Sequence, residues 1–421
     1  MLDVLSMRGS TTVLGFSLTL LVTASAQADE RGALPAPLGV AEVMRLAKAS
    51  RAEVVAARAR AAASAQRPVI VSALEDPQVF TSIDHLPFMG GGADVSLTVQ
   101  QTFPLSHIRG RRQDAAEAEA RRELAQIDRV GLDVELDAAA AFWMVFEARE
   151  TAMIVDEQHA LGEQMVAAAL ARYASNTGSQ ADVLRAQLEL ARLDGERRAL
   201  VAETRATEAM LNTSLARAAD AGIPELDAAI VEVAPPAAGQ LARQALDRRP
   251  ELRVGREEIA RSKADVSVMQ AMDAPMAMVR TGPAYTMAEG PGWMVMVGLS
   301  IPLWRGKVHA AVAEARAMVD MATADLEATR RVIAGEAAAA RERVAAARER
   351  YLALRDTVLP KAKEAVAATL AAYTANQAPL VSAIEVAQAL WAAQRELVMA
   401  HADLGRTWAR LNRATGEEMT R

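Results

Sequence analysis

Two hydrophobic periodicities alternate along this chain, and each of them occurs in both halves. Long stretches carry apolar residues every three or four positions, which is the pattern of amphipathic α-helices. Shorter stretches between them alternate strictly between apolar and polar residues, which indicates β-strands with two chemically different faces. The pattern predicts a short helix, a β-hairpin and two long antiparallel helices in each half.

The alternating stretches have the length of strands that cross a membrane. In 94–103, valine and leucine alternate with polar residues, and in 293–301 the apolar residues share one face. About ten residues of this pattern span a bilayer when one face meets lipid and the other a lumen. A soluble hairpin packed on a helical bundle is the alternative that this periodicity leaves open.

Each of these strands has a partner across a glycine-rich turn. The hairpins are expected at about 77–103 and 276–301, with turns at 89–92 and 289–292. Four strands cannot close a barrel, and open sheet edges cannot lie in lipid. If these strands cross a membrane, several copies of the chain must pool them, which predicts a homo-oligomer.

The helical stretches are long enough to be architectural. Residues 106–172 contain no proline, and at 1.5 Å per residue a helix of that length reaches about 100 Å. A comparable helix is expected at 304–373, with a kink at Pro360. Short breaks then turn the chain back, so that long helices cover 106–218 and 304–415.

Internal matches indicate that the chain is one unit written twice, with an offset of about 200 residues. Tyr173-Ala174-Ser175-Asn176 corresponds to Tyr373-Thr374-Ala375-Asn376, and Leu211-Asn212 corresponds to Leu411-Asn412. A proline-rich linker at 234–237 joins the two copies. We expect a first repeat at 29–234 and a second at 235–421.

Residues 1–28 are typical of a secretory signal peptide. Arg8 supplies a positive charge, 13–22 an apolar core, and the small residues at 24–26 or 26–28 a cleavage site. No later stretch approaches 18 consecutive apolar residues, so no membrane-spanning helix is expected. The exported chain is then periplasmic, secreted or inserted as a β-barrel.

The amino-acid composition limits which functional classes the chain can belong to. The 421 residues are 52% hydrophobic but only 4% aromatic, which is typical of long alanine-rich helices rather than of a compact core. There is no cysteine, the formal charge is −6, and no catalytic triad, phosphate loop or metal-ligand cluster stands out. We therefore expect neither an enzyme nor a cofactor, metal or nucleic-acid site. The charged run at 111–123 is expected to be a solvated helix face.

Several features together resemble the TolC-like outer-membrane efflux protein family. They are the helix start at 246–252 (LDRRPEL), the strand-to-helix passages at 101–105 (QTFPL) and 299–303 (LSIPL), and the doubled Tyr…Asn helix breaks. The resemblance covers essentially the whole chain after the signal peptide. It implies a mainly α-helical trimer whose strands form one twelve-stranded β-barrel, continued by an α-helical tunnel through the periplasm.

The same resemblance implies a function in export. It implies an outer-membrane channel, a passive duct for small solutes such as metal cations or drugs. This channel would dock with a periplasmic adaptor (membrane fusion) protein and an inner-membrane transporter such as an RND pump. The non-lipidated format and the passage at 76–105 look like members paired with heavy-metal exporters. Soft thioethers are available from four methionines, which more often are apolar filler: Met276, Met278, Met294 and Met296.

The resemblance places a pore gate at the tips of the long helices. It implies inward-facing acidic residues, which correspond here to Asp182 in the first tip and Glu385 in the second. Threefold rings of carboxylates favour cations. The alternative is that both are helix-start charges that interact favourably with the helix dipole. Contacts with the adaptor are expected at five tip residues: Gly178, Ser179, Gln180, Pro379 and Leu380.

A soluble periplasmic coiled-coil adaptor or scaffold is the competing interpretation. It explains the signal peptide and the long helices. It does not need four strands of membrane length, nor two copies of a hairpin followed by long helices. We therefore expect a protein of the cell outer membrane that extends into the periplasm.

Overall fold

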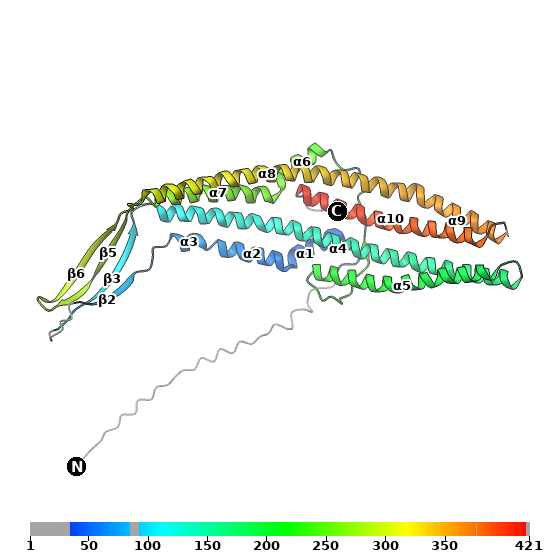
Figure 1. Cartoon of the computed structure of the whole chain (residues 1–421), viewed down its shortest axis with the longest axis horizontal. Helices are drawn as coiled ribbons and strands as arrows, with labels where there is room; N and C mark the ends of the chain where they lie inside the picture. The colour runs from blue at the N-terminus through cyan, green and yellow to red at the C-terminus, as the bar shows by residue number, and fades with distance from the viewer. Residues whose placement is uncertain (1–33, 85–91, 376, 418–421) are drawn as a thin grey trace, which may run out of the picture.

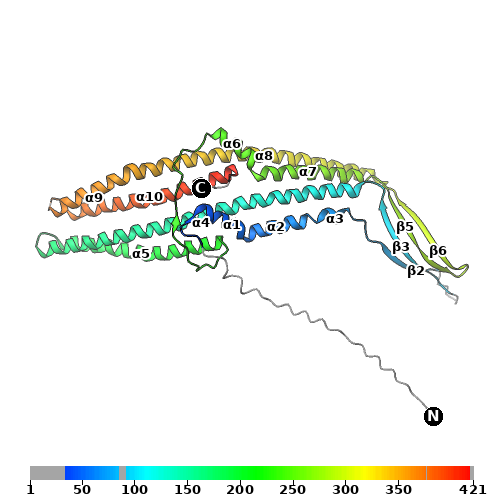
Figure 2. The same cartoon turned by 180° about the vertical axis from the view of Figure 1, so that it is seen from behind.

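The protein is an elongated rod with a β-sheet at one end and two helical tips at the other (Figure 1). This computed structural model describes residues 34–84, 92–375 and 377–417. The expected signal peptide and most of the glycine-rich turn at 89–92 lie outside the described residues. Seen from behind, the long helices follow the rod from the sheet to the tips (Figure 2).

The elements follow the same order in both halves. In the first half, short elements lead to a hairpin, a very long helix and a returning helix: β1 Leu38–Gly39, α1 Val40–Ser50, α2 Ala52–Ser64, α3 Arg67–Ser72, β2 Gln78–Asp84, β3 Asp94–Pro104, α4 Ile108–Ala174 and α5 Gln180–Ser214. The second half repeats this order: β4 Leu226–Asp227, α6 Ala238–Arg248, α7 Pro250–Ala271, β5 Met276–Thr286, β6 Gly290–Ser300, α8 Arg305–Ala353, the π-helical turn η1 Leu354–Val358, α9 Leu359–Thr374 and α10 Leu380–Thr415. This mainly helical architecture, with two hairpins and long antiparallel helices, confirms the predicted fold class.

The helix expected at the start of each half is interrupted. Residues 40–66 contain α1 and α2, and the counterpart at 239–272 contains α6 and α7. The backbone is extended at both breaks, with φ and ψ of −68° and 138° at Arg51 and of −61° and 123° at Arg249. Pro250 accounts for the second break, because the residue before a proline disfavours the helical region. No proline follows Arg51, so the sequence pattern did not predict the first break.

The long helices run without interruption from the sheet to the tips. α4 is a single helix of 67 residues, and α8, η1 and α9 give the second half a comparable path. Pro360, where a kink was expected, is the second residue after the π-helical turn. In a regular α-helix its ring would clash with the carbonyl four positions earlier. The wider π turn accommodates the proline, so the helical path continues to the tip.

A cluster of aromatic rings lies at mid-length, where α4 packs against α10. Trp143 and Phe146 of α4 contact His401 of α10, and Phe142 contacts Trp143, with ring centroids between 4.7 and 5.8 Å apart. Gly405 is required beside this cluster, because a Cβ atom there would lie 2.1 Å from the Trp143 ring. Small residues elsewhere along these helices allow the same close approach, which explains the alanine-rich composition.

Ion pairs connect the two halves along α4. The charged run at 111–123 was expected to be a solvated helix face, and 111–114 and Arg121 are indeed exposed. The last part of the run also faces α7: Arg121 pairs with Glu257 at 2.9 Å, and Arg122, which is half-buried, pairs with Glu258 at 3.0 Å.

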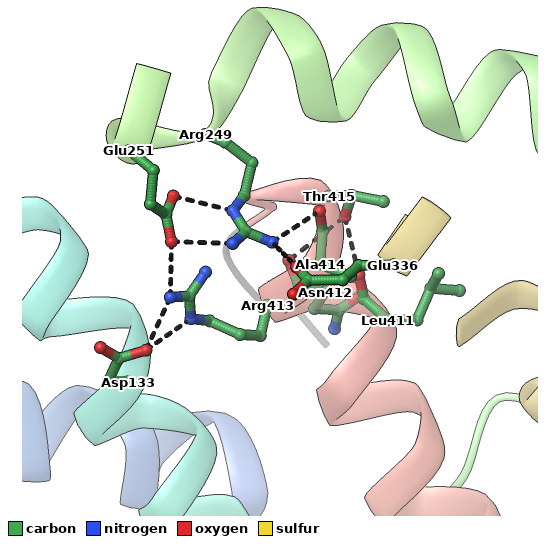
Figure 3. Close-up of polar contacts among 9 residues, drawn as sticks. All are labelled: Asp133, Arg249, Glu251, Glu336, Leu411, Asn412, Arg413, Ala414 and Thr415. Carbon is green, nitrogen blue, oxygen red and sulfur yellow. Dashed lines mark hydrogen bonds and ion pairs between the residues drawn. The ribbon is translucent and has the colours of Figure 1, made fainter. Parts of the chain in front are cut away.

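A network of buried charges joins the elements at the middle of the rod (Figure 3). Arg249, only 6% exposed, donates to the Glu251 carboxylate at 2.8 Å and to the carbonyl of Ala414 at 3.2 Å. Arg413 of α10 donates to Glu251 at 2.7 Å and to Asp133 of α4 at 2.8 Å. The LDRRPEL segment is thereby a joint that fixes α4, α7 and the end of α10 to one another.

The joint perturbs the titration of its central carboxylate. Burial by itself would raise the pKa of Glu251, but hydrogen bonds from Arg249 and Arg413 outweigh it and hold the pKa at about 2. The ordinary value is 4.5. A depressed native pKa stabilises the fold above the unfolded value, and this contribution disappears as the pH falls from about 4.5 to about 2.

We expect Glu251→Gln to lower the free energy of unfolding at pH 7 by about 3 kcal/mol, because two largely buried guanidinium groups lose their anion. The difference from wild type should shrink as the pH falls from about 4.5 to about 2, where the wild-type carboxylate takes up its proton. Denaturant unfolding followed by circular dichroism at several pH values measures this. Glu349→Gln removes a carboxylate that is 73% exposed and should change the free energy by less than about 0.5 kcal/mol. Equal effects of the two substitutions would contradict the assignment.

Candidate functional site

The two helical tips lie side by side at the end of the rod away from the sheet (Figures 1 and 2). One is the turn between α4 and α5, and the other is the turn between α9 and α10. An apolar cluster contains residues of both hairpins: Met165, Ala169, Val183, Ala186, Tyr373, Leu380 and Ala383. The two tips are therefore packed on each other within one protomer.

The first tip is a tight backbone turn. The amides of Thr177 and Gly178 both donate to the carbonyl of Arg172, at 2.9 and 3.0 Å, which closes the end of α4. Asn176 takes the left-handed conformation with φ of 56°, which asparagine tolerates better than most residues. Gly178 lies so near the end of α4 that a Cβ atom there would be 3.0 Å from the Cβ of Arg172.

Asp182 has a structural role at the start of α5. Its amide donates to the Ser179 hydroxyl at 3.2 Å, while its carboxylate accepts from the Ser179 amide at 3.3 Å and from the hydroxyl at 2.8 Å. This reciprocal capping box satisfies amides that the helix start leaves unpaired. The signal for it was present in the sequence, because Ser-x-x-Asp before a helix is its signature.

The second tip is built differently. Pro379 precedes α10 and no side-chain cap is present there, while Leu380 is only 2% exposed. The amide of Gln377 donates to the carbonyl of Ala372 at 2.8 Å, which closes the end of α9. Asn376 lies outside the described residues. Because Leu380 packs inside the apolar cluster, it presents little surface to a partner in this conformation.

Arg172 clasps the two tips together. Its guanidinium donates to the carbonyl of Tyr373 in the other hairpin at 3.0 Å and to the carbonyl of Thr177 at 3.2 Å. Its Cζ also lies 4.5 Å from the centroid of the Tyr373 ring, in cation–π geometry. The sequence pattern did not predict a role for Arg172. The offset of 200 pairs Arg172 with Ala372, so this departure from the repeat was the available signal.

The two predicted gate acids differ in environment. Asp182 is half-buried in its capping box, whereas Glu385 is exposed on α10. Asp182 is the third residue of α5 and Glu385 the sixth residue of α10. A rise of 1.5 Å per residue therefore places Glu385 about one helical turn farther from its tip. The tips hold acids at two depths, of which Glu385 is the more accessible to solvent.

At the opposite end, the four-stranded sheet exposes its apolar face. The strand order is β2-β3-β5-β6, with every pair antiparallel, so β3 and β5 join the two hairpins. On the apolar face, Trp293 and Val297 of β6 are 69% and 73% exposed. On the other face, Ser96 and Thr98 of β3 are 8% and 2% exposed. This reverses the arrangement of a soluble sheet and suits a sheet with lipid outside.

The polar face of the sheet carries a positively charged side chain. Arg280 of β5 lies opposite Gln100 of β3 and Met296 of β6 in the register. Its guanidinium donates twice to Oε1 of Gln100, at 2.6 and 3.0 Å, and its Cζ lies 4.4 Å from the centroid of the Phe80 ring. The strand alternation also places on this face the methionines considered for soft metals: Met276, Met278, Met294 and Met296.

Among the residues that the structure describes, no three His, Asp or Glu side chains gather closely enough to hold a metal ion. Within the same described ranges, no helix is long and apolar enough to cross a membrane.

The second half of the chain matches a known family, described as outer membrane efflux protein, over residues 241–417. No curated protein matches the chain at significant similarity.

Solved structures share the fold along nearly the whole chain. The outer-membrane channel OprN is 18% identical with a TM-score of 0.76, and the match covers 90% of this chain and 89% of OprN. The outer membrane protein VceC of Vibrio cholerae is 16% identical with a TM-score of 0.74, covering 90% and 96%. The MtrE outer membrane channel of Neisseria gonorrhoeae, solved in its open state, is 14% identical with a TM-score of 0.74, covering 90% and 89%.

Replacing Arg172 by methionine should loosen both tips, because the variant keeps the aliphatic length but loses the cross-hairpin hydrogen bond and the stacking on Tyr373. We expect amide hydrogen exchange at 173–179 and 372–375 to accelerate by about tenfold, the value of one charge-assisted hydrogen bond. Mass spectrometry of peptic fragments measures it. Arg192→Met is the matched control, since Arg192 is exposed and pairs only locally with Glu189. Unchanged exchange in the Arg172 variant would contradict the clasp.

Proposed function

We propose that this chain belongs to the outer membrane efflux protein family, whose model matches residues 241–417, and that it is the outer-membrane channel of a tripartite efflux system. In this proposal three copies pool their four strands into a twelve-stranded barrel, and their helices continue it as a tunnel through the periplasm. The observation that carries the proposal is the four-stranded sheet, with an exposed apolar face opposite a face on which the polar residues Ser96 and Thr98 are buried.

Lipid explains the polarity of the sheet better than water does. A soluble sheet covers its apolar face with helices, but here Val295, Val297 and Leu299 of β6 are 65%, 73% and 57% exposed. Membrane barrels alternate apolar residues toward lipid with polar residues toward the lumen. A soluble coiled-coil adaptor, the competing interpretation, has no use for such a surface, and exposing it would promote aggregation.

Closure of the sheet requires other copies of the chain. The order β2-β3-β5-β6 leaves β2 and β6 at the edges of the described sheet. In hydrocarbon an unpaired backbone edge is not tolerated, so β6 of one copy has to pair with β2 of the next. Three copies give twelve strands and also place three pairs of helical tips around one axis. This arrangement supports the homotrimer expected from the sequence.

The tips form the periplasmic entrance in this proposal. Gly178, Ser179, Gln180 and Pro379 lie at the turns and are available to an adaptor protein. Leu380 contributes indirectly, by holding the two hairpins together. The pump, such as an RND transporter of the inner membrane, and the adaptor supply energy and docking, so the duct itself needs only a continuous path.

Glu385 is proposed as the principal gate acid. It is exposed on α10, so three copies can form an acidic ring that attracts cations. Asp182 adds to this ring only in part, because its carboxylate already accepts two hydrogen bonds from Ser179. The two interpretations of these acids, helix-start charge and gate acid, then each apply to one residue. Asp182 caps a helix at the entrance, and Glu385 faces the permeating ions.

The cargo remains a small solute in this proposal, a metal cation or a drug. The hypothesis that the cargo is a heavy metal rests on the resemblance in sequence and on the four methionines of the second hairpin. These methionines share the polar face of the sheet, where they border the path of the solute. A role as ordinary filler fits the same positions.

A pair of neighbouring substitutions in β6 tests the proposed function. Val295→Arg places a charge toward lipid, at a cost of about 2–4 kcal/mol per copy near the bilayer centre, whereas Met294→Arg places the same charge toward the lumen. We expect Met294→Arg to be recovered from the outer-membrane fraction as a detergent-extracted trimer on an unheated gel, like the wild type. Val295→Arg should be lost from that fraction. Recovery of the wild type as a soluble periplasmic monomer, or equal tolerance of both substitutions, would overturn the proposal.

The gate is tested by ion selectivity in planar bilayers. Glu385→Gln should lower the ratio of potassium to chloride permeability by about twofold or more, because three carboxylates leave the entrance. Asp182→Asn should have a smaller effect, since this carboxylate is engaged in the capping box. Glu327→Gln, on α8 about 70 Å from the tip by helical rise, is the matched control. If Glu385→Gln and Glu327→Gln give the same ratio, Glu385 is a helix-surface charge and not a gate.

A further inference from the structure

We propose that Arg280 forms a positive belt inside the barrel, so that the membrane segment of the duct favours small anions while the periplasmic entrance favours cations. The inference rests on the proposed function, because the belt exists only when three copies enclose a lumen. It concerns a residue of the sheet, far from the tips (Figure 1).

The register of the sheet places Arg280 in the lumen and not in the lipid. Arg280 lies beside Gln100 of β3 and Met296 of β6, on the face that includes the buried Ser96 and Thr98. Its strand neighbours Val279 and Thr281 point to the opposite, apolar face. A guanidinium toward lipid at this height would be strongly disfavoured, so the alternation itself directs the charge inward.

The partners of Arg280 hold it without neutralising it. Both hydrogen bonds go to the amide oxygen of Gln100, and the stacking partner is the ring of Phe80. An arginine kept only for stability usually pairs with a carboxylate, as Arg249 and Arg413 do with Glu251 in the joint. At Arg280 an amide and an aromatic ring fix the orientation of the guanidinium, and its full positive charge remains.

The acids of the sheet are too distant to cancel this charge. Among the described residues of the four strands, Asp84 and Asp94 are the only acids, and they lie opposite each other in the strand register at the far end of the hairpin. They stand six residues beyond the level of Gln100 and Arg280, which is about 20 Å along a strand. The Debye length at physiological salt is about 8 Å. Glu75 and Asp76 come closer, just before β2, where the carbonyl of Glu75 accepts a hydrogen bond from the Gln101 side chain at 2.8 Å. Within the described strands, Arg280 is the only charged residue at its own level.

Three such charges around a closed lumen repel cations and attract anions, as basic rings do in other pores. The duct then has two filters in series, with carboxylates at the periplasmic entrance and guanidinium groups in the membrane. Anionic solutes pass the second filter more easily than cations of the same size. A metal cation leaving the pump would pass it more readily as a neutral or anionic complex than as a free ion.

The test measures the reversal potential of purified trimers in planar bilayers under a potassium chloride gradient. The salt is kept near 0.01 M on the dilute side, where the Debye length is about 30 Å and the belt reaches the centre of the lumen. The wild type, Arg280→Gln and Arg280→Lys are compared. The same three are measured with Asp182→Asn and Glu385→Gln combined, so that the acids at the entrance do not mask the barrel.

In the background without the entrance acids, Arg280→Gln should lower the ratio of chloride to potassium permeability by about twofold or more. Arg280→Lys should keep the wild-type ratio, because it keeps the charge and changes only the hydrogen bonds. If the wild type, Arg280→Gln and Arg280→Lys all conduct with the same ratio of chloride to potassium permeability, the belt is wrong, while the proposed channel function is unaffected. Wild-type protein that forms no conducting trimer would overturn the proposed function, and the belt with it.

Discussion

The open edges of the four-stranded sheet set a requirement that the rest of the structure has to meet. β2 and β6 lie at the ends of the described sheet, and the residues on its apolar face are exposed. Water can satisfy such edges, but hydrocarbon cannot, so strands with this surface are stable in a membrane only when other strands complete the ring. The long helices begin within a few residues of β3 and β6, and a threefold barrel therefore also fixes where six long helices start.

A tunnel wall of that kind needs thin helices that pack closely, and the interior of the rod is built accordingly. Gly405 leaves room for the ring of Trp143, and alanine is frequent among the buried residues of the long helices. The apolar area available per helix is small, so buried charges contribute as well. Arg249, Glu251 and Arg413 join three helices at mid-length.

The two repeats are alike in architecture and different in chemistry where function is proposed. The first tip has a capping box and Arg172, whereas the second has Pro379 and no side-chain cap. The first hairpin supplies Gln100 and Phe80, whereas the second supplies the charge of Arg280. In both places one repeat holds a group of the other in position. The two halves share the scaffold, and the polar groups differ between them.

The sequence by itself determined the elements and their order. Apolar residues at every second position located the hairpins, and apolar residues at every third or fourth position located the long helices. These periods follow directly from strand and helix geometry. The acids Asp182 and Glu385 were found from resemblance. Periodicity could not find the break at Arg51 or the π turn before Pro360, because both are local changes within an otherwise helical pattern. It could not find the clasp of Arg172 on Tyr373 either, because these two residues are distant in sequence. Only the tertiary structure decided which charged residues pair, since the ion pairs of α4 with α7 and the partners of Arg280 arise from register between elements more than 100 residues apart.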